Sequence, residues 1–359
     1  MRLPEHGANP HRLYESLAME TPAQLYDFSE NVNAKGLPPR IKAIWPSLLE
    51  TIIKYPDPLG EPFLSAVAEF HGFPENHFFI GNGAAEVLAL LAERYRNKHA
   101  VIVHPTFSEY AATLREKASK IESVYMKEST QFQLPMTEIK EAMQRADVIY
   151  LCTPNNPTGI LPPKAKLIEL ARYGLEVACE VVLDEAFIDF IGEKYSLISE
   201  MNNYPNVLIL RSMTKMYAIP GLRLGYLIAQ PSVIQQLKKF TPHWNVNGIA
   251  AQVGAYCLQE SEFVVQTIEE TAKERELMKA FLLEQHCHVA ASQTNFLLFT
   301  YHHKELTTRL HRDLLARGIV LRHTESFPGL NGTWLRIGIK SPERMQFLRE
   351  EMTRWFNIN

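Results

Sequence analysis

The sequence predicts an α/β protein with a large domain, whose mostly parallel sheet is flanked by helices, and a small α+β domain. The chain has 359 residues, which is long for one ordinary core. Between Tyr55 and Pro242, short runs that are apolar on both faces alternate with helical stretches, as in a buried parallel sheet. Beyond Pro242 the pattern changes to a long amphipathic helical region and a mixed segment.

The short apolar runs predict the strands of the large domain. The first run, at 77–80, enters the turn Gly81-Asn82-Gly83, and an apolar-striped helix over 84–96 follows it. Further strands are predicted at 100–104, 148–152, 181–184, 207–211 and 225–229. Because such strands are apolar on both faces, we expect helices to cover both sides of the sheet.

The rest of the chain predicts the small domain. The helical region extends to about Glu284. Strands are then predicted near 295–300, 319–322 and 334–338, with helices at 304–317 and 342–356. We therefore assign residues 47–245 to the large domain, and residues 1–46 and 246–359 to a small domain with an N-terminal arm.

The composition excludes several classes of protein. A net charge of -3 without a dense Lys/Arg stripe gives no reason to expect a nucleic-acid partner. No apolar run is long enough to span a bilayer, and the first ten residues lack the apolar stretch of a signal peptide. Four scattered cysteines favour a reducing compartment. We expect a cytoplasmic protein with neither a nucleic-acid nor a membrane partner.

Two motifs resemble binding sites of other kinds. His286-Cys287-His288 has no companion pair at the spacing of structural zinc, so no metal site is predicted. The turn at Gly81-Asn82-Gly83 opens a helix whose N–H groups could bind an anion. Glu86 stands where a dinucleotide fingerprint has its third glycine, which argues against a nicotinamide site. Taken alone, this segment could equally be a plain strand–helix turn.

Polar motifs follow the ends of successive predicted strands. Residues 153–159 are TPNNPTG and residues 184–187 are DEAF. Residues 212–215 are SMTK, and PGLRLGY follows at 220–226. Sites in open α/β sheets gather at the carboxyl ends of the strands. The motifs therefore place an amide, a carboxylate, a hydroxyl, an amine and a guanidinium in one region.

These motifs resemble those of the fold-type I pyridoxal-phosphate enzymes of the aminotransferase superfamily, from about Tyr55 to Arg336. The resemblance implies an aspartate aminotransferase-like fold and pyridoxal 5'-phosphate as the cofactor. It implies that Lys215 binds the cofactor as a Schiff base and moves protons. Asp184 would keep the pyridine nitrogen protonated, so that the ring can accept electrons. Asn156 would hydrogen-bond the ring hydroxyl oxygen.

The same resemblance implies roles for further residues. Phe107 would stack on the cofactor ring. The cofactor phosphate would meet backbone amides, a hydroxyl and a guanidinium, contributed by Gly83, Ala84, Ala85, Ser212 and Arg223. Tyr55 would reach that phosphate from a neighbouring subunit, which implies a homodimer. Arg336 would bind the substrate carboxylate.

A narrower resemblance is to the threonine-phosphate decarboxylases of cobalamin biosynthesis. It is carried by four segments: HGAN at 6–9, FSENVN at 28–33, DEAFIDF at 184–190 and KMYAIPGLRLGY at 215–226. In that family the first segment is HGGN-like, so Ala8 is a small departure. The resemblance implies that Arg322, helped by His6 and Asn31, binds the substrate phosphate.

The narrower resemblance implies a pyridoxal-phosphate-dependent carboxy-lyase that acts on a small phosphorylated amino acid. The expected reaction is decarboxylation of L-threonine O-3-phosphate to (R)-1-amino-2-propanol O-2-phosphate. In this chemistry the bond held perpendicular to the ring is the one that breaks, so the groups that orient the substrate select the reaction. Phe187 agrees with this expectation, because many aminotransferases have a tyrosine there.

Two alternatives stay open. If Phe187 is a neutral variation, the chain could be a histidinol-phosphate:2-oxoglutarate aminotransferase, which needs a keto acid as second substrate. A cofactor-binding regulatory domain is the other alternative. It is disfavoured because no helix-turn-helix pattern or basic extension precedes Tyr55.

Overall fold

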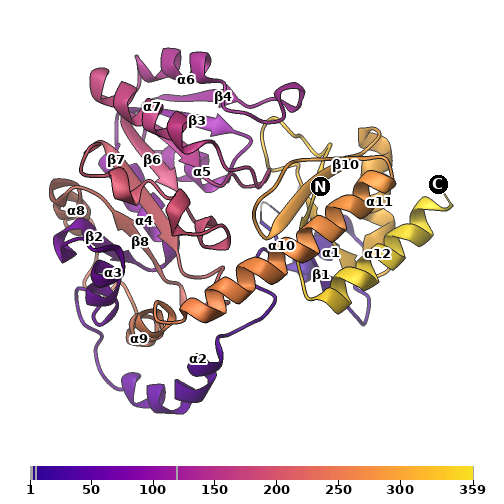
Figure 1. The fold of residues 1–359 in the computed structure, drawn as a ribbon, viewed down its shortest axis with the longest axis horizontal. Coiled ribbons are helices and arrows are strands. Elements are labelled where there is room, and N and C mark those ends of the chain that lie inside the picture. The colour runs from indigo at the N-terminus through magenta and orange to yellow at the C-terminus, as the bar shows by residue number, and fades with distance from the viewer. Residues whose placement is uncertain (1–2, 5, 119, 359) are drawn as a thin grey trace.

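The computed structural model of the protein describes residues 3–4, 6–118 and 120–358. A large α/β part and a smaller part lie at opposite ends of the molecule, and the long helix α10 (Ser261–Glu284) extends from one to the other (Figure 1). Both chain ends lie on the side of the smaller part (Figure 1). No helix in the described residues is long and apolar enough to cross a membrane.

The large part is built on a sheet with the strand order β2-β8-β7-β6-β5-β3-β4. Its strands are β2 (Phe78–Gly81), β3 (His99–His104), β4 (Lys120–Tyr125), β5 (Val148–Cys152), β6 (Glu180–Asp184), β7 (Val207–Ser212) and β8 (Gly225–Ile228). Strand β8 is antiparallel to β2 and β7, whereas β4, β3, β5, β6 and β7 pair in parallel. The predicted mostly parallel sheet is confirmed; edge strand β4 was not among the predicted strands.

Both faces of this sheet are buried. Successive residues of each strand point to opposite faces, so one strand contributes side chains to two hydrophobic clusters. On β5, Ile149 and Leu151 pack in one hydrophobic cluster, whereas Val148 and Tyr150 pack in another. The first cluster is covered by α2 (Pro39–Ile44), α3 (Phe63–His71), α6 (Met136–Met143), α7 (Lys164–Glu176) and α9 (Gly248–Cys257). The second is covered by α4 (Gly83–Arg94), α5 (Glu109–Leu114) and α8 (Pro231–Lys238).

The smaller part contains an antiparallel sheet with the order β12-β13-β10-β9. Its strands are β9 (Cys287–Val289), β10 (Phe296–Tyr301), β12 (Arg322–His323) and β13 (Leu335–Gly338). The predicted strand at 319–322 is divided between β11 (Ile319–Val320) and β12. Strand β9 was not predicted, and it explains the His286-Cys287-His288 motif: Cys287 is buried in the sheet while His288 is exposed.

The N-terminal residues join this smaller part. Strand β1 (Tyr26–Asp27) pairs in parallel with β11, and helix α1 (Pro10–Leu17) packs nearby through Tyr14, whose hydroxyl donates to the backbone oxygen of Leu315 at 2.7 Å. Phe28 shares a hydrophobic cluster with residues of α10, α11 (Lys304–Ala316) and α12 (Pro342–Phe356). The N-terminal arm is therefore anchored beside β11 and β13, where the Phe28 backbone forms hydrogen bonds with Val320 and Gly338.

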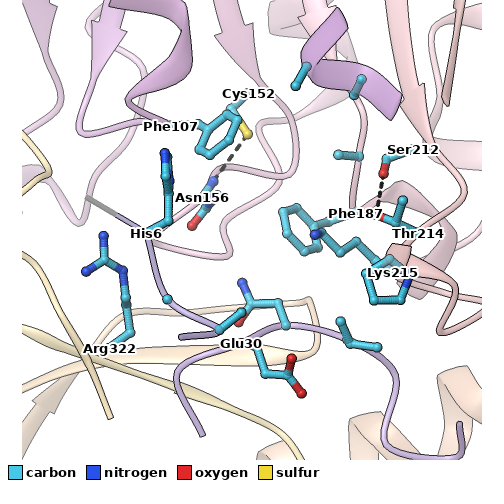
Figure 2. Close-up of a pocket in the computed structure, with 18 of the residues that line it drawn as sticks. His6, Glu30, Phe107, Cys152, Asn156, Phe187, Ser212, Thr214, Lys215 and Arg322 are labelled. Atoms are coloured by element: carbon cyan, nitrogen blue, oxygen red, sulfur yellow. Dashed lines mark hydrogen bonds between the residues drawn. The ribbon is translucent and has the colours of Figure 1, made fainter. Parts of the chain in front are cut away.

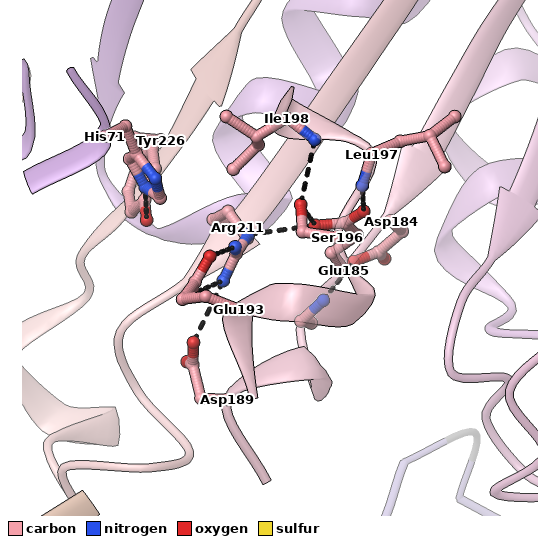
Figure 3. Close-up of polar contacts among 11 residues, drawn as sticks. His71, Asp184, Glu185, Asp189, Glu193, Ser196, Leu197, Ile198, Arg211 and Tyr226 are labelled. Carbon is pink, nitrogen blue, oxygen red and sulfur yellow. Dashed lines mark hydrogen bonds and ion pairs between the residues drawn. The ribbon is translucent and has the colours of Figure 1, made fainter. Parts of the chain in front are cut away.

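A buried ion cluster holds the ends of β6 and β7 together (Figure 3). The Arg211 side chain is 2% exposed and contacts three carboxylates. Its Nε lies 3.1 Å from Oε2 of Glu185, and its Nη1 donates at 2.9 Å to Asp189 and to Glu193. Burial raises the pKa of Asp189 to about 7, with Arg211 opposing and the other two carboxylates adding to the rise. The cluster fixes the strand ends that carry Asp184 and Ser212.

Candidate active site

A cavity of about 500 Å³ lies where the carboxyl ends of β5, β6 and β7 face the smaller sheet and the N-terminal arm (Figure 2). Its lining includes most of the residues that the sequence predicts as site residues: His6, Asn31, Ala84, Ala85, Phe107, Asn156, Asp184, Ser212, Lys215, Arg223, Arg322 and Arg336. Three sources therefore build one site: the large sheet, the arm and the smaller sheet.

Lys215 extends into this cavity from the segment after β7 (Figure 2). Burial, together with the positive charges of Arg223 and Arg336, lowers the pKa of its amine to about 8, against the opposing charges of Glu30 and Asp184. A lysine with a lowered pKa is more often neutral near pH 7 and is then a nucleophile. The backbone oxygen of Lys215 accepts a hydrogen bond from the Asn33 N–H at 3.0 Å, which ties the arm to this segment.

Asp184, at the end of β6, is 5% exposed and also lines the cavity. Its Oδ2 accepts a hydrogen bond from the Tyr110 hydroxyl at 2.6 Å, and its Oδ1 accepts one from the Ala186 N–H at 3.0 Å. Burial raises the pKa of Asp184, whereas these two hydrogen bonds and the charge of Lys215 oppose the rise. The site thus holds one buried carboxylate with two tethered oxygens.

The start of α4 and Arg223 form an anion-binding corner. Gly83 has a φ of +76°, and a Cβ on it would lie 2.6 Å from Nη2 of Arg223, so only glycine lets the guanidinium come this close. The N–H groups at a helix start attract anions. The Ser212 and Thr214 hydroxyls, 2.9 Å apart, lie on the same side of the cavity (Figure 2).

Arg336 of β13 is a deeply buried cation on the opposite wall, with 5% of its surface exposed. Its Nη1 donates to the Asn156 side-chain oxygen, and its Nη2 donates to the Ser29 backbone oxygen at 2.8 Å. Within the described residues both acceptors are neutral, and no ion pair joins Arg336 to a carboxylate. Burial lowers the pKa of its guanidinium to about 9. A buried cation of this kind is stabilised by an anionic ligand.

Arg322 lies beside Arg336, because the two residues are partners in the β12–β13 register. It lies over the Phe327 ring, with 5.4 Å between guanidinium carbon and ring centroid, and its Nη1 is 2.8 Å from Nε2 of His323. Burial lowers the pKa of Arg322 to about 10. Two neighbouring guanidinium groups therefore face the same cavity.

The N-terminal arm closes one side of the site. The His6 Nε2 lies 2.8 Å from Oε1 of Glu109, and its ring centroid lies 5.7 Å from that of Phe107. Asn31 is buried, and its side-chain oxygen has no hydrogen-bond partner among the described residues. The arm thus brings polar groups to the cavity and contacts the large part through α5.

Two predicted residues do not line the cavity. Gly83 lies behind it, where its missing side chain makes room for Arg223. Tyr55 is 83% exposed, and its ring lies against Trp244 with centroids 4.9 Å apart. A single chain does not place Tyr55 in the site, so its role across a subunit interface stays a prediction.

Sequence reasoning missed several residues of the site. Thr214 lines the cavity from inside the Ser212–Lys215 motif, where it received no role. Tyr110 follows Phe107 by three residues, and this spacing could have suggested a shared face of the chain. Phe327 comes from an irregular loop after β12, where no pattern in the sequence signals it.

Comparison with known proteins gives four findings. The family model described as aminotransferase class I and II matches residues 23–351. Threonine-phosphate decarboxylase of Salmonella typhimurium is 32% identical over 338 residues, which cover 94% of this chain and 92% of that protein. Histidinol-phosphate aminotransferase of Desulfitobacterium hafniense is 32% identical over 306 residues, 82% of each chain. The crystal structure of histidinol-phosphate aminotransferase from Clostridium acetobutylicum matches with a TM-score of 0.87 and 25% identity, over 93% of this chain and all of that one.

Proposed function

This chain belongs to the aminotransferase class I and II family, and on that basis we propose that it decarboxylates L-threonine O-3-phosphate. The predicted family and the predicted aspartate aminotransferase-like fold are confirmed. Pyridoxal 5'-phosphate, the predicted cofactor, is confirmed as well. The chain is a pyridoxal-phosphate-dependent enzyme, and the choice of reaction is the part that we propose.

The residues of the cavity fit this cofactor. The close approach of Arg223 to Gly83 at the start of α4 suits a phosphate ester. Other residues of the cavity suit the ring and the aldehyde of the cofactor. We assign Lys215 to the aldehyde and Asp184 to the ring nitrogen. Asn156 would bind the ring hydroxyl oxygen, and Phe107 would stack on the ring face. Ala84, Ala85 and Ser212 complete the phosphate site. When bound, pyridoxal phosphate takes up the electron pair left by a bond that breaks at the α-carbon.

The neighbouring buried cations Arg322 and Arg336 carry the proposal for the substrate. They are register partners on β12 and β13, and both line the cavity. Such a pair suits one small substrate with two anionic groups. L-Threonine O-3-phosphate has both anionic groups, a carboxylate and a phosphate, in one molecule. Histidinol phosphate has only the phosphate, so the aminotransferase would use both cations only for its second substrate, 2-oxoglutarate, which has two carboxylates. We assign Arg336 to the carboxylate, and Arg322, with His6 and Asn31, to the phosphate.

In this proposal the chain orients the substrate and moves one proton. Arg336 and Arg322 fix the position of the carboxylate relative to Lys215, which decides which bond is held for cleavage. The bond between the α-carbon and the carboxylate breaks, carbon dioxide leaves, and a proton adds to the α-carbon. Lys215 is the group that we assign to deliver this proton. The contact between His6 and Glu109 holds the arm against the large part beside the site.

A second candidate is histidinol-phosphate:2-oxoglutarate aminotransferase. This candidate is supported by the histidinol-phosphate aminotransferase of Desulfitobacterium hafniense, which is 32% identical to this chain. The decarboxylase of Salmonella typhimurium has the same identity. The decarboxylase aligns over more of this chain, 94% against 82%. The aminotransferase needs a keto acid in every cycle, and the decarboxylase needs none.

We also propose a cytoplasmic homodimer in which Tyr55 reaches the cofactor phosphate of its partner. Large apolar side chains are exposed along 45–59, including Leu49 at 64%, Ile52 at 64% and Ile53 at 78%. A contiguous apolar surface of this kind is typical of an interface between protein chains. A second copy of the chain is the occupant that we propose for it.

Carbon dioxide release from a panel of substrates tests the proposed function. The panel holds threonine phosphate, serine phosphate and unphosphorylated threonine, each with enzyme saturated in pyridoxal phosphate. We expect rapid release from threonine phosphate without added keto acid, and much slower release from threonine, because it lacks the second anion. No release from any of the three would exclude the decarboxylase.

A further inference from the structure

Tyr110, the second residue of α5, lies beneath the cavity and contacts a group that the cofactor needs. We propose that Tyr110 is a positioning residue, which holds the Asp184 carboxylate charged and oriented toward the ring nitrogen of pyridoxal phosphate. The inference rests on the proposed role of Asp184, and it assigns a function to a residue outside the motifs of the sequence.

The contact between Tyr110 and Asp184 is short and fully buried. The Tyr110 hydroxyl donates to Oδ2 of Asp184 at 2.6 Å, and the Tyr110 side chain is 0% exposed. This distance is in the range of hydrogen bonds from a hydroxyl to an ionised oxygen. The other carboxylate oxygen accepts from the Ala186 N–H at 3.0 Å. Each oxygen is therefore held by one donor, and the carboxylate plane is fixed between them.

The hydroxyl also keeps the carboxylate charged. Burial raises the pKa of Asp184, and the hydrogen bond from Tyr110 is the first of the effects that oppose it. Burial raises the pKa of the Tyr110 hydroxyl well above its ordinary range, so the hydroxyl stays protonated and can donate near neutral pH. A neutral carboxylic acid at position 184 would not balance the positive charge of a protonated ring nitrogen.

Packing fixes where the Tyr110 hydroxyl points. Its ring meets the Phe107 ring edge-to-face, with centroids 5.9 Å apart and an interplanar angle of 86°. On its other side lies the Tyr150 ring of β5, at 5.6 Å. One turn of chain thus supplies both the proposed ring platform, Phe107, and the donor to Asp184. A change at Tyr110 is transmitted to both groups that we assign to the cofactor ring.

The variant Tyr110→Phe tests the proposal through the binding of pyridoxal phosphate to the apoprotein. We expect about tenfold weaker binding near pH 7, the size typical of losing a hydrogen bond to a charged group. Because a lost donor raises the pKa of Asp184, affinity should begin to fall at a higher pH than in the wild type as the solution is acidified. Equilibrium dialysis at several pH values, with the visible absorbance of the bound cofactor, measures both effects.

Tyr150→Phe is the matched control. The Tyr150 hydroxyl is buried and has no hydrogen-bond partner among the described residues. The Tyr150 ring is the neighbour of the Tyr110 ring. Its removal should leave cofactor affinity and the pH profile unchanged. This control distinguishes the loss of a specific donor from the loss of any buried hydroxyl in this cluster.

The double variant Tyr110→Phe with Asp184→Asn shows whether Tyr110 acts through Asp184. In the Asp184→Asn background we expect the Tyr110→Phe change to cost no further affinity and to leave the pH profile unmoved. The proposal is overturned if Tyr110→Phe binds the cofactor like the wild type at every pH. It is also overturned if the loss is equally large with and without Asp184. Neither outcome depends on which reaction the enzyme catalyses, so the proposed function is tested separately.

Discussion

Arg336 carries a charge that the folded protein leaves without a carboxylate partner among the described residues. Its neighbours Asn156 and Ser29 offer neutral oxygens, and burial together with nearby Arg322 lowers its pKa to about 9. Arg211 is equally buried but is surrounded by carboxylates. We therefore propose different functions for the two arginines: Arg211 maintains the structure, and Arg336 binds an anionic group of the substrate.

Replacing Arg336 by glutamine should remove most of the activity. Losing one partner of a buried ion pair costs about 2–5 kcal/mol. In this case the ion pair is the one that we propose between Arg336 and the substrate carboxylate. We expect kcat/KM for threonine phosphate to fall by the corresponding factor, while the affinity for pyridoxal phosphate changes little. Steady-state carbon dioxide release measures the first quantity, and dialysis measures the second.

Arg309→Gln is the control for this prediction. Arg309 is an exposed residue of α11 with a side chain 60% exposed, so its loss should leave kcat/KM unchanged. An Arg336→Gln enzyme with unchanged kcat/KM would show that another cation binds the carboxylate.

At the residue scale, the sequence could predict groups that stand in motifs at strand ends. Asp184 ends β6 and Lys215 follows β7, whereas Arg223 precedes β8, which runs antiparallel to β7, so all three positions lie at one edge of the sheet. Their roles stay predictions, but the structure places all three around one cavity. Tyr110 could not be assigned a role in the same way, because its partner is 74 residues away in the sequence and the contact exists only in the fold.

At the scale of elements, the start of α4 depends on the absence of a side chain at Gly83. Gly83→Ala should weaken pyridoxal-phosphate binding strongly, because the new Cβ would lie 2.6 Å from the Arg223 guanidinium. It should also cost about 1 kcal/mol of folding stability, because alanine is strained at a φ of +76°. Dialysis and urea unfolding of the apoprotein measure these two effects.

Gly72→Ala provides the matched control. Gly72 ends α3 with a φ of +69°, and a Cβ added to it would have no other atom within 4 Å. This variant should lose a similar amount of stability and no cofactor affinity. Equal losses of affinity in both variants would mean that strain, and not the displacement of Arg223, explains the effect of Gly83→Ala.

Most strands of the large sheet could be predicted because they are short, continuously apolar and buried on both faces. Strand β4 at the sheet edge could not, since Val124 is its only buried residue and its sequence includes the charged residues Lys120 and Glu122. Strand β9 was missed for a similar reason, because only Cys287 of its three residues is buried. Continuous apolarity predicts the centre of a parallel sheet and says little about its edges.

At the scale of the whole molecule, the ion cluster behind the site makes stability depend on pH. The pKa of Asp189 rises from its ordinary value to about 7 on folding, so the folded protein binds this proton more tightly than the unfolded chain. The contribution of Asp189 to stability is therefore present at low pH and is lost as the pH rises through about 7. The destabilisation caused by Asp189→Asn should shrink over the same range.

Urea unfolding of wild type and Asp189→Asn at about pH 5 and about pH 8 measures this difference. Glu141→Gln, which changes an exposed carboxylate on α6, is the control and should show no dependence on pH in this range. A destabilisation by Asp189→Asn that grows with pH would mean that Arg211 holds Asp189 ionised and that its pKa is lowered.

The proposed dimer can be tested by complementation between two inactive variants. Lys215→Ala removes the amine, and Tyr55→Ala removes the side chain that we assign to the partner's site. Mixed dimers would contain one site with both wild-type residues, so a one-to-one mixture should recover about a quarter of wild-type activity. Activity after mixing that equals the mean of the separate variants would place Tyr55 in its own subunit's site or outside both.

The most direct test of the proposed reaction is an NMR time course with all the competing substrates in one sample, in which phosphorus spectra follow the phosphate esters and proton spectra follow 2-oxoglutarate. The sample holds the enzyme saturated with pyridoxal phosphate, together with threonine phosphate, histidinol phosphate and 2-oxoglutarate. We predict that the threonine phosphate signal is replaced by that of 1-amino-2-propanol phosphate, with one carbon dioxide released per product, while histidinol phosphate and 2-oxoglutarate persist. Consumption of histidinol phosphate in step with 2-oxoglutarate, with threonine phosphate left intact, would show instead that the enzyme is an aminotransferase.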